Sequence, residues 1–280
     1  MEHAEQLARV YGPTTWDLYA ELDRSLAPRG PDWLLTKASE YLESGAVVLD
    51  AGCRDAAHLI RLVRDNDVRG YGVDPVPLHI AHAQAAVEAA ELSDRITLQC
   101  TGMEDAPSLG ELFDLVWCRD VLEQVADLPG ALAGVAQVLK PTGHLLVFTQ
   151  VATELLDDRD AALLGAHLGN VLTNLDAQHL ETAFGEAGLE VVEKDVIGTE
   201  WREYAEERTQ PVSRALLRLA RLRRTRDHLV ATHGQDVYDH AEANLHWEVF
   251  QFLGKLQPTV YVLRHGRGPG RADALVRARG

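Results

Sequence analysis

The sequence contains little cysteine, no long apolar run and too few basic residues to balance its acids. Three cysteines in 280 residues, Cys53, Cys100 and Cys118, include no C-x-x-C pair, so neither a disulfide framework nor a zinc site is indicated. No apolar run approaches the ~20 residues that span a bilayer, and residues 1–10 are polar, without a signal-peptide core. A formal net charge of −16 argues against nucleic acid as a partner. We therefore expect a soluble, cytoplasmic protein with no membrane or nucleic-acid partner.

The composition is otherwise that of a globular protein with a large core. Hydrophobic residues make up 46% of the chain and charged residues 25%, both ordinary values. At 280 residues the chain can form one enlarged domain or a domain with a cap. His79 and His82 have a spacing that metal ligands can have, but the sequence places no third ligand, so we expect no metal.

Strand-like and helical patterns alternate between residues 45 and 150. The expected strands cover 46–50, 70–74, 95–100, 113–118 and 144–149, with a turn at Pro141-Thr-Gly before the last of them. The expected helices cover 56–66, 78–92 and 128–139. This alternation predicts parallel strands with right-handed crossovers, which is a doubly wound α/β sheet.

The remaining segments predict additions to this sheet. A helix over 176–187 and a strand over 189–197 precede a long helical stretch broken at Pro211 and Gly234, and 258–264 is the closing strand. The predicted units are an N-terminal helical cap (1–44), an α/β core (45–199), a helical lid inserted before the last strand (200–256), the closing strand of the core (257–265) and a disordered tail (266–280).

The turn after the first strand is the most informative stretch. It begins with the acid Asp50, contains Gly52, and leads into a helix; the strand that follows ends in Asp74, twenty-four residues further on. At that distance, the carboxylate of an acidic residue can accept hydrogen bonds from both hydroxyls of a ribose. A dinucleotide-binding domain is the competing interpretation. We reject it because that fingerprint needs three glycines, and an acid at the turn would repel a diphosphate.

Four motifs, taken in order, resemble the class I S-adenosylmethionine-dependent methyltransferases. They are Val-Leu-Asp-Ala-Gly-Cys from residue 48, Gly-Val-Asp-Pro from 72, Phe-Asp-Leu-Val-Trp-Cys-Arg-Asp-Val-Leu-Glu-Gln-Val from 113, and Val-Leu-Lys-Pro-Thr-Gly-His-Leu-Leu-Val from 138. The resemblance covers residues 45–200. It implies S-adenosyl-L-methionine as the cofactor, a Rossmann-like sheet of about seven strands and a small-molecule methyl acceptor.

The resemblance also assigns residues to the parts of the cofactor. It places Asp74 on the ribose diol, with Pro75 and His79 beside the ribose, and Met103 with Glu104 or Asp105 against the adenine. The methionine portion is expected to lie against Asp50, against the backbone of Ala51, Gly52 and Cys53, and against Cys118 and Arg119.

Three motifs depart from the family pattern. Family members commonly have Gly-x-Gly-x-Gly at the first turn, whereas Arg54 and Ala56 follow Gly52 here. Arg54 either pairs with the cofactor carboxylate or points to solvent. The acid often found before the adenine loop is replaced by Gly102, and Glu123-Gln124 replaces the Glu-His pair of relatives that methylate quinone precursors.

Acceptor-binding residues are sought in the segments that flank the core. In such methyltransferases, helices before the first strand often cover the substrate pocket, which makes Tyr11, Trp16 and Tyr19 candidates; ordinary core packing is the alternative. Trp201, Tyr204 and Trp247 either frame an acceptor in the lid or form the core of the lid. By residue type and position, the candidate bases and acceptor contacts are His167 and His246, with His179 a further candidate base.

The leading hypothesis is a methyltransferase of secondary metabolism that acts on oxygen, nitrogen or carbon of a small molecule, as a monomer or homodimer. The alternative is a methyltransferase fold that has lost catalysis and serves as a binding or partner module, which the altered glycines motivate. Six arginines crowd residues 214–226. They form either a solvated cationic face or a docking site for an acidic partner or substrate.

Overall fold

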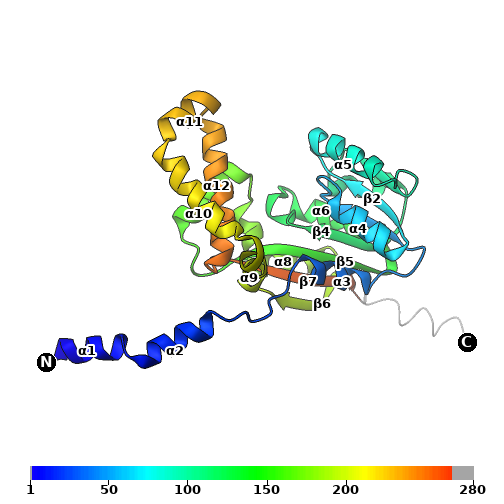
Figure 1. Cartoon of the computed structure of the whole chain (residues 1–280). Helices are drawn as coiled ribbons and strands as arrows, with labels where there is room; N and C mark the ends of the chain where they lie inside the picture. The colour runs from blue at the N-terminus through cyan, green and yellow to red at the C-terminus, as the bar shows by residue number, and fades with distance from the viewer. Residues whose placement is uncertain (1, 267–280) are drawn as a thin grey trace, which may run out of the picture.

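The computed structural model describes residues 2–266 of the chain, in which seven strands form one sheet (Figure 1). The strand order is β3-β2-β1-β4-β5-β7-β6; β7 is antiparallel to both of its neighbours and the other pairs are parallel. The strands are β1 (Val47–Ala51), β2 (Arg69–Val73), β3 (Ile96–Gln99), β4 (Phe113–Arg119), β5 (Leu139–Ala152), β6 (Leu189–Val196) and β7 (Leu256–His265). The predicted doubly wound α/β fold is therefore confirmed.

Successive residues of each central strand point to opposite faces of the sheet, and both faces are covered by helices. Val48 and Leu115 pack against α3 (Pro31–Ser39), α4 (Ala57–Asn66) and α5 (Pro77–Ala89). Leu49 and Val116 pack on the other face against η1 (Met103–Leu109), α6 (Leu128–Val138) and α8 (Ala177–Glu186). All five residues of β1 are buried, which explains why the apolar run before Asp50 identified this strand.

The predicted turn at Pro141-Thr-Gly is wrong, because these residues lie inside β5. The strand begins at Leu139, and its register with β4 jumps from Phe113–Leu139 to Leu115–His144. The proline and glycine therefore mark an irregularity in the pairing, which a strand can absorb without ending.

Four helices are inserted between β6 and β7 and stand beside the carboxyl edge of the sheet (Figure 1). They are α9 (Glu200–Thr209), α10 (Pro211–Arg224), α11 (Arg226–His233) and α12 (Gln235–Phe252), and α12 also packs on α7 (Asp158–Leu168). Pro211 opens α10 at its first turn, and Gly234, with φ +92°, separates α11 from α12. We call α9–α12 the lid.

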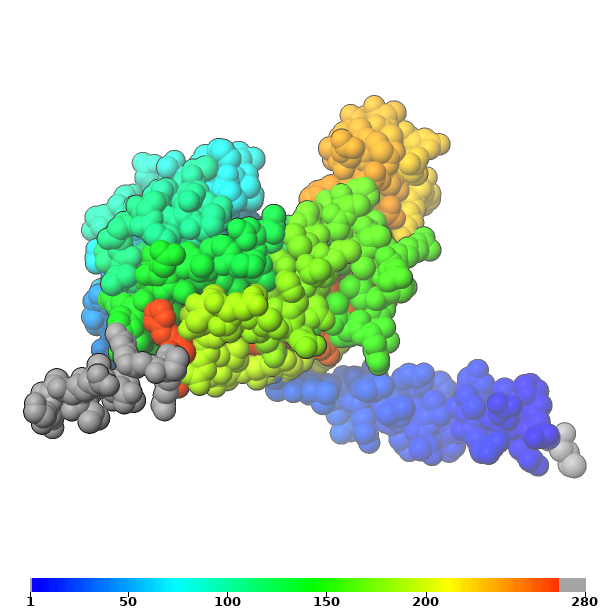
Figure 2. Space-filling view, turned by 180° about the vertical axis from the view of Figure 1, so that it is seen from behind, coloured from blue at the N-terminus to red at the C-terminus, as the bar shows by residue number. Residues whose placement is uncertain are grey.

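The N-terminal helices α1 (Glu2–Val10) and α2 (Pro13–Leu22) form an arm that leaves the body of the molecule (Figures 1 and 2). No residue of either helix is buried, and Tyr11, Trp16 and Tyr19 are 71%, 69% and 57% exposed. The structure therefore does not bring these three aromatic residues to a pocket. The expected N-terminal helices are present, but the sequence did not indicate that their aromatic side chains are exposed.

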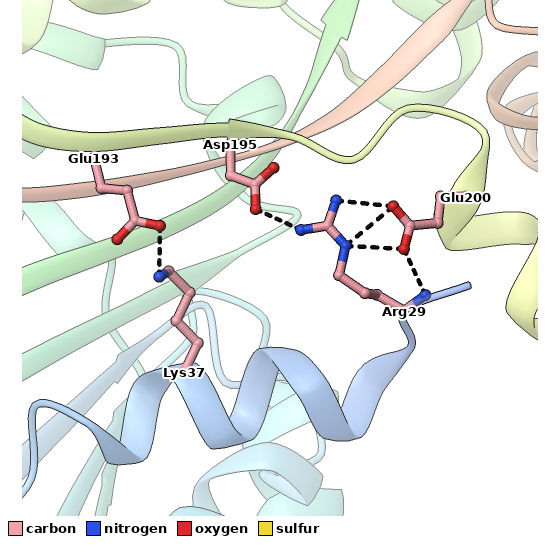
Figure 3. A network of polar contacts seen from close by, with 5 residues as sticks. All are labelled: Arg29, Lys37, Glu193, Asp195 and Glu200. Carbon is pink, nitrogen blue, oxygen red and sulfur yellow. Dashed lines mark hydrogen bonds and ion pairs between the residues drawn. The ribbon is translucent and has the colours of Figure 1, made fainter. Parts of the chain in front are cut away.

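A network of ion pairs holds the chain where the arm joins the body (Figure 3). The guanidinium of Arg29 donates to Glu200 on α9 and to Asp195 on β6, and Glu200 also accepts from the backbone N–H of Arg29 at 2.7 Å. Lys37 on α3 pairs with Glu193 at 2.6 Å. The carboxylates raise the pKa of Arg29 further above its usual range, against the opposing effect of burial. Residue 29 is thus fixed to β6 and the lid.

Two further expectations concern the C-terminal tail and membrane-spanning segments. The predicted disordered tail lies outside the described residues except for Gly266. Among residues 2–266, no helix combines the length and apolar character needed to cross a bilayer.

Candidate functional site

A crevice of about 870 Å³ opens at the carboxyl ends of β1, β2 and β4. The strand order reverses between β1 and β4, and open α/β sheets bind ligands at such a switch point. Ten of the predicted cofactor residues line the crevice, namely Asp50, Gly52, Cys53, Arg54, Asp74, Pro75, His79, Met103, Glu104 and Arg119.

The turn after β1 keeps a glycine-like backbone although two of its expected glycines are absent. Gly52 has φ +87°, Arg54 φ +47° and Ala56 φ +59°, so all three positions are left-handed. A Cβ atom on Gly52 would lie 2.3 Å from a methyl group of Val121, so only glycine fits there. Arg54 and Ala56 accept the backbone strain instead. The side chain of Arg54 is 73% exposed and lies 3.5 Å from Asp55.

Asp74 is buried and organises the neighbouring loop. Its carboxylate accepts from the backbone N–H groups of Arg54 (3.0 Å) and Val76 (2.9 Å), and Nδ1 of His79 lies 3.0 Å from its Oδ1 atom. A carboxylate offers about four acceptor positions. Three are used here, so a position remains for a ligand hydroxyl, and displacing His79 would free a second.

Asp50 and Arg119 bring opposite charges to the floor of the crevice. Burial raises the pKa of Asp50 to about 7, with smaller contributions from Asp74 and Asp55, while Arg119 lowers it. Such a carboxyl is close to half ionised at neutral pH, and a nearby cation would favour its charged form.

Arg119 also connects the crevice with the lid. Its Nη1 atom contacts Nε2 of His58, and its guanidinium lies 5.5 Å from the ring of Phe148 and 5.6 Å from that of Trp201 on α9. Burial, followed by the charge of Arg119, lowers the pKa of His58 to about 4. His58 is therefore neutral at physiological pH and accepts the hydrogen bond from Arg119.

The opposite end of the crevice is formed by the start of η1. Met103 is buried with its side chain in the core next to the crevice, and the Glu104 carboxylate lies over Gly102. A Cβ atom on Gly102 would lie 2.2 Å from that carboxylate. Glu104 thus occupies the space of the acid that the family pattern expects at position 102.

Three predicted cofactor residues are not in the crevice lining, namely Ala51, Cys118 and Asp105, the alternative to Glu104. Ala51 and Cys118 belong to the core that faces α6 and α8, because β-strand residues alternate between the two faces. Burial raises the pKa of the Cys118 thiol well above its usual range, so this group stays protonated. The side chains of Ala51 and Cys118 therefore point away from the crevice, and only their backbone can contribute to it.

The predicted acceptor residues of the lid and α7 are absent from the crevice lining. Trp201 is buried against Phe148, 4.7 Å between ring centroids, and Tyr204 packs over Gly30. Trp247 packs beside a small core formed by Leu164, Leu175, Phe250 and Leu256. His246 contacts Arg223 and the backbone of Glu242, and the carbonyl of His167 accepts from His240. Core packing, the alternative for the aromatic residues, describes their positions.

The sequence did not predict several residues that line the crevice. Among them are three polar residues, His58, which contacts Arg119, and Asp120 and Gln124, which follow Arg119 in the chain. His58 lies in the first turn of α4, directly after the glycine turn, and this position could have pointed to it. Asp120 lies directly after β4 with φ +52°, a conformation that aspartate adopts more often than most residues.

Asp120 belongs to a hydrogen-bond network that runs from the crevice toward the lid. Its Oδ1 atom accepts from Nε2 of Gln150 (3.0 Å), and the backbone N–H of Gln150 donates to Glu123 (2.6 Å). Thr149 also donates to Glu123, at 2.8 Å. Burial, with the nearby charge of Asp120, raises the pKa of Glu123 to about 7. The network holds the ends of β4 and β5 in place.

The chain is similar to known methyltransferases. A family described as "Methyltransferase domain" matches residues 23–194, more than half of the chain. The chain is 35% identical over 106 residues to a ubiquinone biosynthesis O-methyltransferase of Rhodopseudomonas palustris, covering 38% of this chain and 40% of that protein. It is 26% identical over 151 residues to 27-O-demethylrifamycin SV methyltransferase of Amycolatopsis mediterranei, covering 53% and 56%. The chain thus spans about half the length of these curated relatives.

Among solved structures, the fold is similar to that of the cyclopropane synthase MmaA2 of Mycobacterium tuberculosis. The TM-score is 0.63 at 17% identity, over 83% of this chain and 81% of that chain, and at this identity the likeness concerns the fold alone. The family match, the strand order and the crevice at the switch point agree with one another. The chain belongs to the methyltransferase domain family, whose cofactor is S-adenosylmethionine.

Proposed function

We propose that the protein transfers a methyl group from S-adenosylmethionine to an oxygen, nitrogen or carbon atom of a small molecule in secondary metabolism. The observation that carries the proposal is the set of three charged groups in one crevice, Asp74, Asp50 and Arg119. The cofactor has a ribose diol, an ammonium with a sulfonium, and a carboxylate. Each of the three side chains is complementary to one of these parts.

The remaining lining residues fit the same assignment. Asp74 retains an acceptor position for the diol, and Pro75 and His79 flank it. Met103 supplies apolar surface for the adenine, and Glu104 supplies an acceptor for its amino group. Arg119, whose side chain is 20% exposed, is the candidate for the carboxylate, whereas Arg54, at 73%, would have to fold inward from solvent to reach it.

The bound cofactor supplies a methyl group on a sulfonium, whose leaving group is already activated, so the protein contributes mainly position. Asp120 and Gln124 line the wall beyond Arg119, and Gln124 bonds the carbonyl of Leu168 at the end of α7. This wall is where we place the acceptor. Where the acceptor must lose a proton, Asp120 is the base we assign, in place of His167 and His246. Gln150 holds the Asp120 carboxylate in a fixed orientation.

A small acceptor is favoured by the lid beside the crevice and by the net charge of −16. The names of the relatives support the same class, since one acts in ubiquinone biosynthesis and one on a demethylrifamycin. Both are O-methyltransferases by name or by the position they methylate. An acceptor hydroxyl is therefore the first choice for a substrate screen.

The alternative is a fold that binds a ligand or partner without catalysis, as the replaced glycines suggest. The left-handed backbone at Arg54 and Ala56 argues against a blocked turn. Calorimetry with S-adenosylmethionine and S-adenosylhomocysteine tests the proposal, and we expect both to bind. A folded protein that binds neither would contradict the proposal and support the alternative.

A panel of phenols, amines and carbon acids with methyl-labelled cofactor then identifies the acceptor class. The Asp120→Asn variant should lose turnover but keep cofactor binding.

A further inference from the structure

The arm carries an apolar surface that nothing in its own chain covers. Its large apolar side chains are all exposed, namely Leu7, Val10, Tyr11, Trp16, Leu18, Tyr19 and Leu22. Residues 1–24 also carry five acidic side chains against two arginines. The arm is thus an acidic amphipathic surface, and so many exposed apolar residues on one segment are typical of an interaction site.

A surface of opposite character lies on α10. Arg214, Arg218, Arg221 and Arg224 follow one another at helical spacing, are exposed, and form no ion pair with any other residue in the described range 2–266. Leu217, also exposed, lies in the same row. No acidic residue occurs in α10. We call this row the arginine stripe.

The arm does not reach the stripe of its own chain. Its root is held at α9 by Ser25, which donates to Glu207 at 2.9 Å, and by the Arg29 network (Figure 3). From there the arm leads away from the lid, as both overall views show (Figures 1 and 2). An arm held in this direction meets a complementary stripe only on another molecule.

We propose that two copies of the chain exchange arms, each acidic arm docking on the arginine stripe of the other copy. The two contacts are identical and related by a two-fold axis, so the assembly closes as a dimer. An aromatic side chain buries about 150–250 Å². Three aromatic and four aliphatic residues in each of two arms therefore suffice for the ~1,600 Å² of a standard stable interface. The charges set partner and register, and the apolar residues supply most of the stability.

Two charge-reversed variants test the exchange. One reverses the arm with Asp17→Arg and Glu21→Arg, and the other reverses the stripe with Arg214→Glu and Arg218→Glu. Molar mass is measured by light scattering after size exclusion. We expect wild type to be dimeric and each variant alone to dissociate at least tenfold more readily. An equimolar mixture should dimerise again, because both contacts of the mixed dimer then join opposite charges.

The mixture separates exchange from docking within one chain, which a second molecule cannot restore. Arg64→Glu with Arg159→Glu, a matched reversal of two exposed arginines outside the stripe, should leave the dimer unchanged. A chain lacking residues 1–24 should be monomeric and still bind S-adenosylhomocysteine. A monomeric wild type, or a mixture that stays monomeric, would overturn the exchange while leaving the proposed methyl transfer untouched.

Discussion

Arg54 and Ala56 have positive φ angles, which glycine adopts far more readily than other residues. Both lie in the turn that contacts Asp74. The N–H of Arg54 donates to Asp74, and that of Ala56 donates to the carbonyl of Cys53 at 2.7 Å. These bonds hold the turn in place against the steric cost of a Cβ atom at positive φ. At the scale of single residues, the crevice is therefore shaped by strain as well as by charge.

Arg54→Gly should stabilise the protein. Relief of the left-handed strain gains about 1–2 kcal/mol, and the greater freedom of glycine in the unfolded chain costs about 0.5–1 kcal/mol. We expect a net gain of about 0.5–1 kcal/mol in the free energy of unfolding, measured with urea. Arg54→Ala is the matched control, since it removes the guanidinium and keeps the strain. Equal stability of the two variants would show that the turn is not strained at this position.

Asp74→Ala should weaken binding of S-adenosylhomocysteine at least tenfold. The ribose diol would lose a charged acceptor, typically about 1.5–3 kcal/mol. The substitution also releases the N–H groups of Arg54 and Val76. His79→Ala, which keeps the carboxylate, serves as the control and should cost much less. Unchanged affinity in a folded Asp74→Ala variant would refute the ribose assignment.

Cofactor affinity should rise with pH up to about 7. The pKa of Asp50 in the free protein is raised to about 7, chiefly by burial, and a bound ammonium or sulfonium lowers it. Binding below pH 7 therefore releases a proton, and the affinity increases by at most about tenfold per pH unit before it levels off. Calorimetry between pH 5.5 and 7.5 measures this slope. Asp50→Asn should bind weakly and without the slope; a slope that survives the substitution would assign the proton elsewhere.

At the scale of elements, the sequence predicted those strands and helices whose residues are apolar because they are buried. β1 and β4 are covered on both faces and appear as apolar runs, and the helices between them follow from the alternation. Prediction failed where position depends on distant parts of the chain. Pro141 lies within β5, and the contact of His58 with Arg119 joins two residues that are sixty-one positions apart in the chain.

Trp16 lies on the arm and Trp201 on the lid, so substitutions at these two positions test how the arm and the lid are attached to the core. Trp201 is buried against Phe148 and Arg119, so Trp201→Ala should cost about 3–5 kcal/mol of unfolding free energy. Trp16 is 69% exposed on the arm, so Trp16→Ala should change monomer stability by less than about 0.5 kcal/mol. Each cost is measured by urea unfolding in the monomeric variant in which Arg214 and Arg218 of the stripe are reversed to glutamate. A large effect at Trp16 there would show that the arm packs on its own body.

At the scale of the whole molecule, the crevice joins two halves of the sheet, because its walls come from β1 and β2 on one side and β4 on the other. A ligand that spans it should therefore stabilise the entire chain. At a concentration of 100 times the dissociation constant, the gain is about 2.7 kcal/mol. For a protein of this size that corresponds to a rise of about 5–10 °C in the midpoint of thermal unfolding. S-adenosylhomocysteine should produce this shift, adenosine a smaller one, and a nicotinamide dinucleotide none, since an acid at the turn repels its diphosphate. Asp74→Ala at the same ligand concentration should lose most of the shift. A dinucleotide that stabilises the protein as strongly as S-adenosylhomocysteine would show that the crevice is not selective for the cofactor of the family.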